Sequence, residues 1–173
     1  EVTWFINAQK DEGLRPKHLK DDGDPTRRQL LKLYEAYEET CRRNGVVDFA
    51  ELLLRSYEIL REVPGLGEHY RARFRHVLVD EFQDTNRLQY AWLKMFAPPG
   101  LGQGVFAVGD DDQSIYGWRN ADITNILDFE RAFPGAAVIK LEQNYRSTGN
   151  ILAAANAVIE NNRDRKGKRL WSD

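Results

Sequence analysis

The stretch from Val77 to Asn86 constrains the fold of this chain more than any other. Three apolar residues, Val77 to Val79, run directly into two carboxylates, Asp80 and Glu81. A short apolar run is typical of a buried strand in a parallel sheet, and open α/β sheets bind ligands at the carboxyl ends of their strands. At such an end one carboxylate can hold Mg²⁺ while its neighbour orients or deprotonates a water, as metal-assisted phosphoryl transfer requires.

The segments on either side of this stretch differ in pattern. Up to about residue 70, apolar spacing predicts helices at about residues 2–9, 25–44 and 48–60, with Asp24 and Asp48 as caps and Gly45 as a stop. From there on, short apolar runs alternate with helical patterns. Strands are predicted at His76–Val79, Val105–Val108 and Ala137–Leu141, and helices at about residues 88–95, 121–133 and 148–161. This alternation favours an α/β fold with a parallel sheet and flanking helices, preceded by a helical segment.

Composition limits the classes of function. Lys plus Arg total 25 against 27 for Asp plus Glu, so any DNA contact should come from a local groove and from stacking rather than from bulk charge. The single cysteine, Cys41, excludes an internal disulfide and suits a reducing cytoplasm. No apolar run approaches the roughly 20 residues of a membrane span, so no membrane partner is expected.

A second polar segment follows the predicted strand Val105–Val108 and contains Gln113. Its neutral amide can sense a γ-phosphate or an attacking water without adding charge. Shortly after it come Tyr116, Trp118 and Arg119, and two exposed rings beside a cation would form a stacking platform for single-stranded bases. The short link predicts that a change of nucleotide state at Gln113 moves this platform. The alternative is that both aromatics belong to the core, as most Trp do.

Two basic features near the C-terminal end of the chain receive different interpretations. Arg146 follows the predicted strand Ala137–Leu141, so it could reach the same sheet edge and neutralise charge on a transferred phosphoryl group. An ordinary surface ion pair is the alternative for this residue. The basic run from Arg163 to Arg169 is interpreted as a solvated crossing segment, with a specific DNA site as the alternative.

These motifs resemble those of the UvrD/Rep/PcrA family of superfamily 1 DNA helicases. Val77–Asn86 resembles the family's Walker B segment, Val105–Ala121 its motif III and Leu141–Thr148 its motif IV. The flanks resemble the family as well, at Trp4–Pro16, Val47–Arg55 and Asn150–Asn162. One departure is Asn120, where close relatives commonly have Gly; Asn tolerates a left-handed backbone better than most residues.

The resemblance implies a fold, a domain division and roles for single residues. It implies that residues 1–70 are the C-terminal part of a helical insertion subdomain and residues 71–173 the C-terminal part of a first RecA-like motor domain. Asp80 would hold Mg²⁺, and Glu81 would position the attacking water. Gln113 would contact the phosphates of ATP. Three further roles follow from the family pattern: adenine stacking by Tyr145, γ-phosphate contact by Arg146 and base stacking by Trp118.

The sequence contains no phosphate-binding loop of the form G-x-x-x-x-G-K-S/T. We therefore expect an interior piece of a cytoplasmic, nucleoid-associated bacterial helicase that translocates on single-stranded DNA, 3′ to 5′ by resemblance, and unwinds duplex DNA with ATP and Mg²⁺. The piece alone should be inactive, and repair or replication proteins are expected partners. Two alternatives stay open: a non-catalytic module of helicase-like fold that binds single-stranded DNA or proteins, and a helicase–nuclease subunit.

Overall fold

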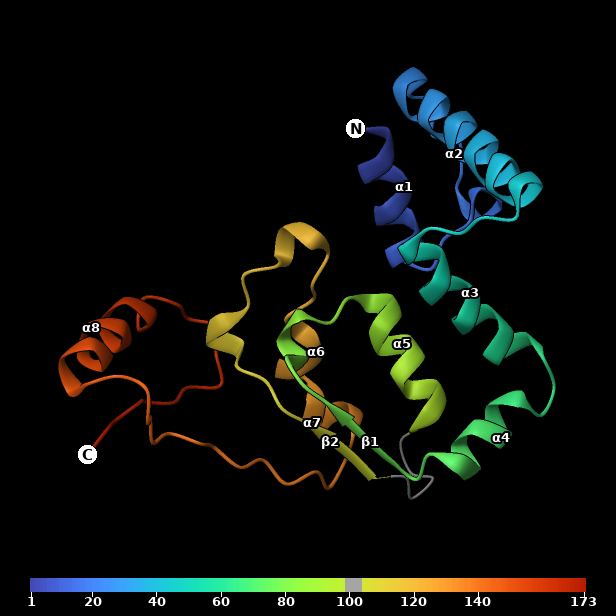
Figure 1. Cartoon of the computed structure of the whole chain (residues 1–173). Helices are drawn as coiled ribbons and strands as arrows, with labels where there is room; N and C mark the ends of the chain where they lie inside the picture. The colour runs from blue at the N-terminus through green and yellow to red at the C-terminus, as the bar shows by residue number, and fades with distance from the viewer. Residues whose placement is uncertain (99–103) are drawn as a thin grey trace.

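The computed structural model describes residues 1–98 and 104–173, and Figure 1 shows its course. Helices form its first part, as the sequence predicts. They are α1 (Val2–Asp11), the 3₁₀ turn η1 (Pro16–His18), α2 (Pro25–Asn44), α3 (Phe49–Glu62) and α4 (Leu66–Arg73). In Figure 1, α1 and α2 lie at one end of the molecule, and α3 leads from them towards α4.

The ends of these helices follow from local side-chain chemistry. The Asp24 carboxylate accepts a hydrogen bond from the backbone amide of Thr26 at 2.9 Å, and the next residue, Pro25, needs no amide partner at the first helical position. Gly45 ends α2 in the left-handed conformation, with a φ of 63°. Asp48 caps α3 by accepting from the backbone amide of Glu51 at 2.6 Å. The predicted caps and the predicted stop are confirmed.

The sheet consists of two parallel strands, β1 (His76–Val79) and β2 (Gly104–Ala107), with Val77 opposite Val105. Between them the chain forms the 3₁₀ turn η2 (Phe82–Asp84) and helix α5 (Arg87–Phe96), which together make a parallel crossover unit. β1 has the predicted bounds, and β2 is shifted by one residue. The predicted α/β fold is confirmed in this coarser form: a mostly helical chain with a small parallel sheet.

Helix α5 joins the sheet to the helical part of the molecule. It packs against α1, α3 and α4, and its buried face contains Leu88, Leu93 and Phe96. The Phe96 ring meets the ring of Tyr70 from α4 edge-on, with centroids 6.2 Å apart. On the sheet side Phe82 is fully buried and directs the loop after β1 into the core. The strand ends are thus fixed to a packed helical support.

The single helix predicted for residues 121–133 is wrong. The structure has two short helices there, α6 (Thr124–Leu127) and α7 (Phe129–Ala132). The Asp122 carboxylate accepts hydrogen bonds from the amide and the hydroxyl of Thr124 at 3.0 and 2.6 Å, which delays the start of the helix. At Asp128 the backbone leaves helical geometry, with a φ of −94° and a ψ of 10°.

The strand predicted for Ala137–Leu141 is also wrong, because this segment pairs with no strand in the described chain. Ile139 and Leu141 are exposed, and the Lys140 ammonium donates to the carbonyl oxygens of Lys166 and Gly167 at 3.2 and 2.5 Å. An apolar run forms a buried strand only where a neighbour covers it. In Figure 1 the segment runs away from the sheet towards α8.

Helix α8 (Gly149–Ile159) agrees with the sequence prediction to within two residues at each end. A bridge between Gln143 and Trp171 returns the last residues of the chain to the segment that precedes α8. None of the helices in the described residues combines the length and the apolarity needed to cross a membrane.

Candidate functional site

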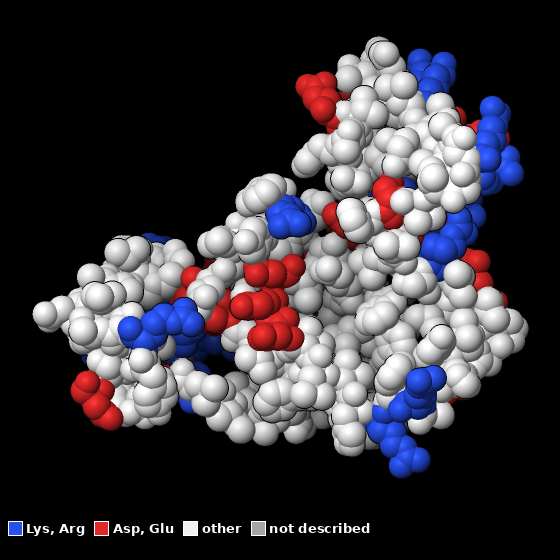
Figure 2. Space-filling view, in the orientation of Figure 1, with Lys and Arg blue, Asp and Glu red and all other residues white. Residues whose placement is uncertain are grey.

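The two strands end side by side in polar loops. β1 leads directly into Asp80 and Glu81, and the loop after β2 contains Asp110. The backbone amide of Val108 donates to the carbonyl oxygen of Val79 at 2.8 Å, so the parallel ladder continues to the point where both loops begin. Figure 2 shows acidic side chains gathered at the centre of this face, over the end of β1. The structure therefore brings the loop that contains Asp80 and Glu81 next to the loop that contains Gln113.

Gln83, for which the sequence pattern predicted no role, connects the two loops. It is only 1% exposed. Its amide nitrogen donates to the Glu81 carboxylate at 2.7 Å, and its amide oxygen accepts from the backbone amide of Asp110 at 2.9 Å. A buried side-chain amide needs partners for both its ends. The sequence feature that could have indicated this role is a neutral amide, Gln83, within the acidic run after β1. Such a side chain suits a contact between loops better than a solvated surface.

The backbone around this connection is strained and closely approached. Glu81 and Asn120 are the non-glycine residues with a positive φ in the described chain, at 49° and 63°. For Glu81 this conformation costs roughly 1–3 kcal/mol, whereas Asn120 tolerates it better; such strain concentrates at functional sites. At Gly109 an added Cβ would lie 2.7 Å from the amide oxygen of Gln83 and 2.9 Å from Cδ1 of Ile126. Only glycine lets the two loops meet this closely.

Asp110 holds the second loop and orients Gln113. One carboxylate oxygen accepts from the backbone amide of Asp112 at 3.0 Å, which starts the 3₁₀ turn η3 (Asp111–Gln113). The other oxygen accepts from the side-chain amide of Gln113 at 2.6 Å. Burial raises the pKa of Asp110, but hydrogen bonds from Lys168 and Gln113 outweigh it, so the pKa lies below its ordinary value. The carboxylate is therefore a charged acceptor at neutral pH.

An exposed aromatic pair follows η3, around the 3₁₀ turn η4 (Gly117–Arg119). Trp118 is 71% exposed, and its ring centroid lies 6.3 Å from that of Tyr116. The Arg119 guanidinium lies 5.4 Å from the centroid of Tyr116 and 5.7 Å from that of Trp118. Asn120 ends the turn in the left-handed conformation that the sequence suggested. The alternative that both aromatics are core residues is wrong, and the arrangement suits flat ligands.

Tyr145 and Arg146 lie apart from the strand ends and from the aromatic pair. They lie in the loop before α8, where Tyr145 is 87% exposed and its hydroxyl donates to the Gln143 side chain at 2.7 Å. The backbone amide of Arg146 donates to the Asn144 side chain at 2.9 Å. Among the hydrogen bonds and ion pairs of residues 1–98 and 104–173, none joins Tyr145 or Arg146 to Glu81.

The exposed carboxylates at the end of β1 have the chemistry of a magnesium site. Asp80 and Glu81 are both exposed, and one oxygen of Asp80 accepts from the Glu81 backbone amide at 2.9 Å. No group of three or more metal-binding side chains occurs in the described residues. Mg²⁺ ordinarily takes one or two carboxylates and completes its shell with waters and phosphate oxygens. These two side chains fit that pattern.

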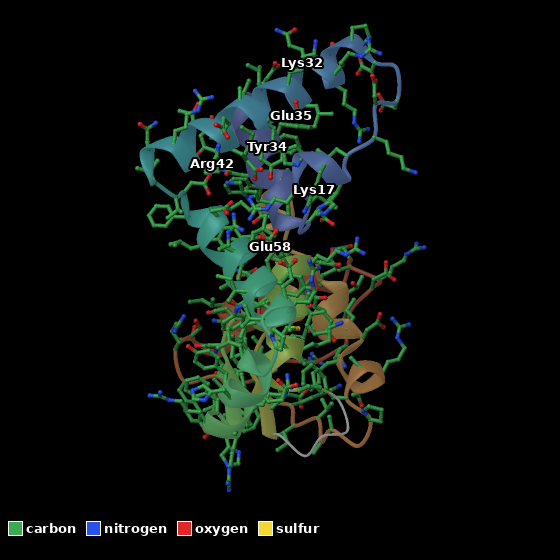
Figure 3. The ribbon with its side chains drawn as sticks, turned by 90° about the vertical axis from the view of Figure 1, so that its right-hand side faces the viewer. Lys17, Lys32, Tyr34, Glu35, Arg42 and Glu58 are labelled. Carbon is green, nitrogen blue, oxygen red and sulfur yellow. The ribbon has the colours of Figure 1, made fainter. Side chains whose placement is uncertain are left out.

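The helical part contains a different charged cluster beside a cavity of about 610 Å³. Arg15 is buried and contacts the carboxylates of Glu38, Glu51 and Glu58 at 2.5, 2.7 and 2.7 Å. Burial lowers the pKa of Arg15, but its hydrogen bonds to these carboxylates raise the pKa by more than burial lowers it. The net pKa lies above its ordinary value, so the guanidinium stays charged. Lys10 adds contacts to Glu51 and to the α3 cap. Figure 3 shows Tyr34 and Glu58 projecting from α2 and α3 in this region. The acids are already paired with cations, so the cluster holds helices together.

Comparison with protein families identifies the relatives of this sequence. Residues 1–134 match the family model described as UvrD/REP helicase N-terminal domain. That range includes both strands, the loops that follow them and the aromatic pair. The matching region therefore contains the whole polar connection from Glu81 to Gln113.

Single relatives extend the likeness over the full chain. DNA helicase II of Escherichia coli is 58% identical over 173 residues, which is 100% of this chain and 24% of that protein. The probable DNA helicase II homolog of Rickettsia felis is 48% identical over 174 residues, 99% of this chain and 26% of that protein. ATP-dependent DNA helicase UvrD1 of Mycobacterium tuberculosis is 45% identical over 177 residues, 97% of this chain and 23% of that protein. The chain thus spans about a quarter of their length.

Proposed function

This chain belongs to the UvrD/REP helicase family, and on that premise we propose that it supplies part of the motor of an ATP-dependent DNA helicase. Residues 71–173 would form the C-terminal part of a first RecA-like motor domain, with β1 and β2 as two strands of its parallel sheet. Residues 1–70 would belong to a helical insertion subdomain. The helical cluster around Arg15 lies before this boundary and the β1–α5–β2 crossover after it, while the boundary itself falls within α4.

The residues after β1 would act on ATP. Asp80 would hold Mg²⁺, which neutralises charge on the phosphates when it is bound. Glu81 would orient the attacking water and accept its proton. Gln83 fixes the Glu81 carboxylate at 2.7 Å, and the left-handed backbone of Glu81 directs its side chain away from an ordinary strand extension. This preorganisation matters because a catalytic group out of place by about 1 Å can lose a factor of roughly 100 in rate.

Gln113, Tyr145 and Arg146 would complete the nucleotide contacts. While one N–H of its amide stays on Asp110, Gln113 would contact the γ-phosphate or the attacking water with its remaining N–H or its oxygen. Tyr145 would stack on adenine and Arg146 would contact the γ-phosphate, as the family pattern implies. The exposure of both residues leaves them free to meet a ligand. Because no bond ties them to Glu81 in the described residues, this part of the proposal requires the loop before α8 to approach the strand ends.

The aromatic pair would bind single-stranded DNA. Tyr116 and Trp118 offer ring faces to bases, and Arg119 adds a cation beside them. Only four residues, Ser114 to Gly117, lie between the proposed phosphate sensor Gln113 and Trp118 of the stacking platform. A change in the partner of Gln113 would therefore move the platform. Such coupling would drive translocation on single-stranded DNA, 3′ to 5′ by resemblance. It would unwind duplex DNA during repair or replication in the bacterial cytoplasm.

The observation that carries this proposal is the bonded path from Glu81 through Gln83 to Asp110 and Gln113, inside a region that matches a helicase family. The test is unwinding of a duplex with a single-stranded tail by the full-length protein, with Mg-ATP. We expect unwinding and DNA-stimulated ATP hydrolysis, with a loss of about 10²–10⁴-fold in kcat for Glu81→Gln. Glu35→Gln, on the exposed face of α2, is the matched control.

Two outcomes would separate the alternatives. DNA binding without unwinding or ATP hydrolysis by the full-length protein would favour a non-catalytic module. Unwinding accompanied by DNA degradation would favour a helicase–nuclease subunit. The 173-residue chain alone should hydrolyse no ATP, because its sequence contains no phosphate-binding loop.

A further inference from the structure

The basic run near the C-terminal end docks onto the loop after β2, and it is not the solvated crossing segment that the sequence suggested. We call Arg165–Lys168 the basic clasp. The Arg165 guanidinium contacts both carboxylate oxygens of Asp112 at 2.8 and 2.5 Å, and the Lys168 ammonium contacts Asp110. The backbone amide of Lys166 donates to Asp111 at 2.7 Å. Three consecutive acids are thus each bound by the clasp.

The two side-chain pairs of the clasp are largely shielded from solvent. The side chains of Arg165 and Asp112 are 14% and 12% exposed, and those of Lys168 and Asp110 are 16% and 21% exposed. By contrast, the Lys166 ammonium pairs with Glu130, whose side chain is 58% exposed. Shielded charge pairs hold their geometry more firmly than exposed ones, because water competes less for their hydrogen bonds. The clasp therefore fixes its loop in one arrangement.

That loop determines the direction of both groups proposed to act on ATP. The carboxylate of Asp110 receives Lys168 on one oxygen and the Gln113 amide on the other. The backbone amide of the same residue donates to Gln83, which in turn donates to Glu81. Lys168 is thus joined to Gln113 through the Asp110 carboxylate, and to Glu81 through the Asp110 backbone and the Gln83 side chain. A rotation of the Asp110 carboxylate would disturb Gln113, and a shift of the Asp110 backbone would disturb Glu81.

From this geometry we infer that Arg165 and Lys168 are positioning residues for ATP hydrolysis, which orient Gln113 and Glu81 through Asp110, Asp112 and Gln83. The inference rests on the proposed function. The clasp touches neither nucleotide nor water in this role; it holds the side chains that do. Loss of Lys168 would leave the Asp110 carboxylate bound only to the Asp112 backbone amide and to Gln113, so Gln113 would sample several directions. Loss of Arg165 would leave the Asp112 carboxylate with the Lys168 ammonium, 3.8 Å away.

A purely structural clasp and a positioning clasp predict different kinetics. A structural clasp would lower the free energy of unfolding and leave kcat per folded molecule unchanged. A positioning clasp would lower kcat while the KM for ATP stays the same, because misdirected Glu81 and Gln113 act mainly on the transition state. The conservative variant Lys168→Arg keeps the cation and should restore kcat in the second case.

The experiment measures DNA-stimulated ATP hydrolysis by the full-length protein and three variants. Lys168→Ala should lose at least about tenfold in kcat, with KM within about twofold. Lys166→Ala removes the same charge from the same segment, but its ammonium binds Glu130, so it should match the unsubstituted protein. Lys168→Arg should recover most of the loss. If Lys168→Ala does not fold, Lys168→Gln takes its place.

The outcomes also separate the inference from the function on which it rests. An unsubstituted full-length protein without ATP turnover overturns the proposed function and the inference together. Normal turnover with equal kcat values for Lys168→Ala and Lys166→Ala overturns the inference alone. A loss in Lys168→Ala that Lys168→Arg does not recover also counts against it, since a restored cation should restore the loop.

Discussion

The helical part and the loop site are both held by charged hydrogen-bond networks, but the networks do different work. Around Arg15, a buried cation joins carboxylates from α2 and α3 and leaves no catalytic group directed to solvent. Around Asp110, shielded pairs fix the loop after β2, and Gln83 connects that loop to the exposed carboxylate of Glu81 in the loop after β1. The first network fixes helices against each other, and the second fixes the directions of the side chains that we propose act on ATP.

Backbone conformation differs in the same way. In residues 1–73 every positive φ belongs to a glycine, at turns where no side chain is strained. In the loop site the positive φ values of Glu81 and Asn120 belong to residues with side chains. Strain of roughly 1–3 kcal/mol per residue survives only where surrounding contacts over-determine the structure. In the helical part the backbone is relaxed, which favours stability. In the loop site strained backbone sets the directions of particular side chains.

Removal of the Arg15 cation should have the largest effect on stability. Arg15→Met leaves three carboxylates close together without their shared partner, so we expect a loss of about 3–5 kcal/mol in the free energy of unfolding. Urea unfolding followed by circular dichroism measures it. Arg28→Met is the control, because its pair with Asp21 is exposed to solvent and should contribute little to the free energy of unfolding. Equal losses in both variants would remove the distinction between the two kinds of ion pair.

Acid should weaken the same cluster next. Burial raises the pKa of Glu51, but hydrogen bonds from Arg15 and Lys10 bring it below the ordinary value, and the Arg15 bonds lower that of Glu58. A carboxylate with a lowered folded-state pKa stabilises the fold above about pH 4.3 and loses that contribution as the pH falls further. The free energy of unfolding, measured from neutral pH downwards, should fall once the pH is below about 4.3. The drop should shrink in Arg15→Met; an unchanged slope would contradict the assignment.

Crowding the junction of the two loops should have a moderate effect. Gly109→Ala forces Gln83 and Ile126 to move, so we expect a loss of about 1–3 kcal/mol in unfolding free energy. In the full-length protein it should also lower ATP turnover, because Gln83 holds Glu81. Gly117→Ala is the control, since an added Cβ there meets nothing within 4 Å. If both substitutions behaved alike, close approach of the loops would not be needed.

Truncation of the exposed platform should have the smallest effect. Trp118→Ala should weaken binding of single-stranded DNA to the full-length protein by about 1 kcal/mol, the lower end for one stacked base, and leave unfolding unchanged. Fluorescence anisotropy of a labelled oligonucleotide measures the affinity. Trp4→Ala removes another exposed indole, on α1, and should bind DNA normally. Equal DNA affinity of the two variants would contradict the assignment of Trp118 to base stacking.

The features that the sequence predicted well depend on neighbours in the chain. The cap at Asp24, the stop at Gly45 and the strand β1 are each determined within a few residues. The features that it missed depend on distant contacts. Gln83 meets a residue 27 positions away, and Arg165 meets one 53 positions away. Such contacts have no periodicity to reveal them.

The two wrong elements have separate physical causes. The run Ala137–Leu141 has the composition of a strand, but composition cannot supply a pairing partner. The helix expected across residues 121–133 starts late because Asp122 bonds to Thr124, and it is interrupted at Asp128, where the backbone leaves helical geometry. Among the site residues, the structure gathers Glu81 with Gln113, and Tyr116 with Trp118 and Arg119. It leaves Tyr145 and Arg146 apart.

The small sheet also governs how this chain behaves in a concentrated solution. Within the described residues β1 and β2 pair with each other alone, so each strand has one side whose backbone groups are free to pair. Leu78 and Phe106 are 74% and 61% exposed beside those edges. An open, apolar strand edge is a template for pairing with another copy. Preparations of the isolated chain should therefore self-associate as concentration rises, and a charged substitution at Leu78 should delay precipitation.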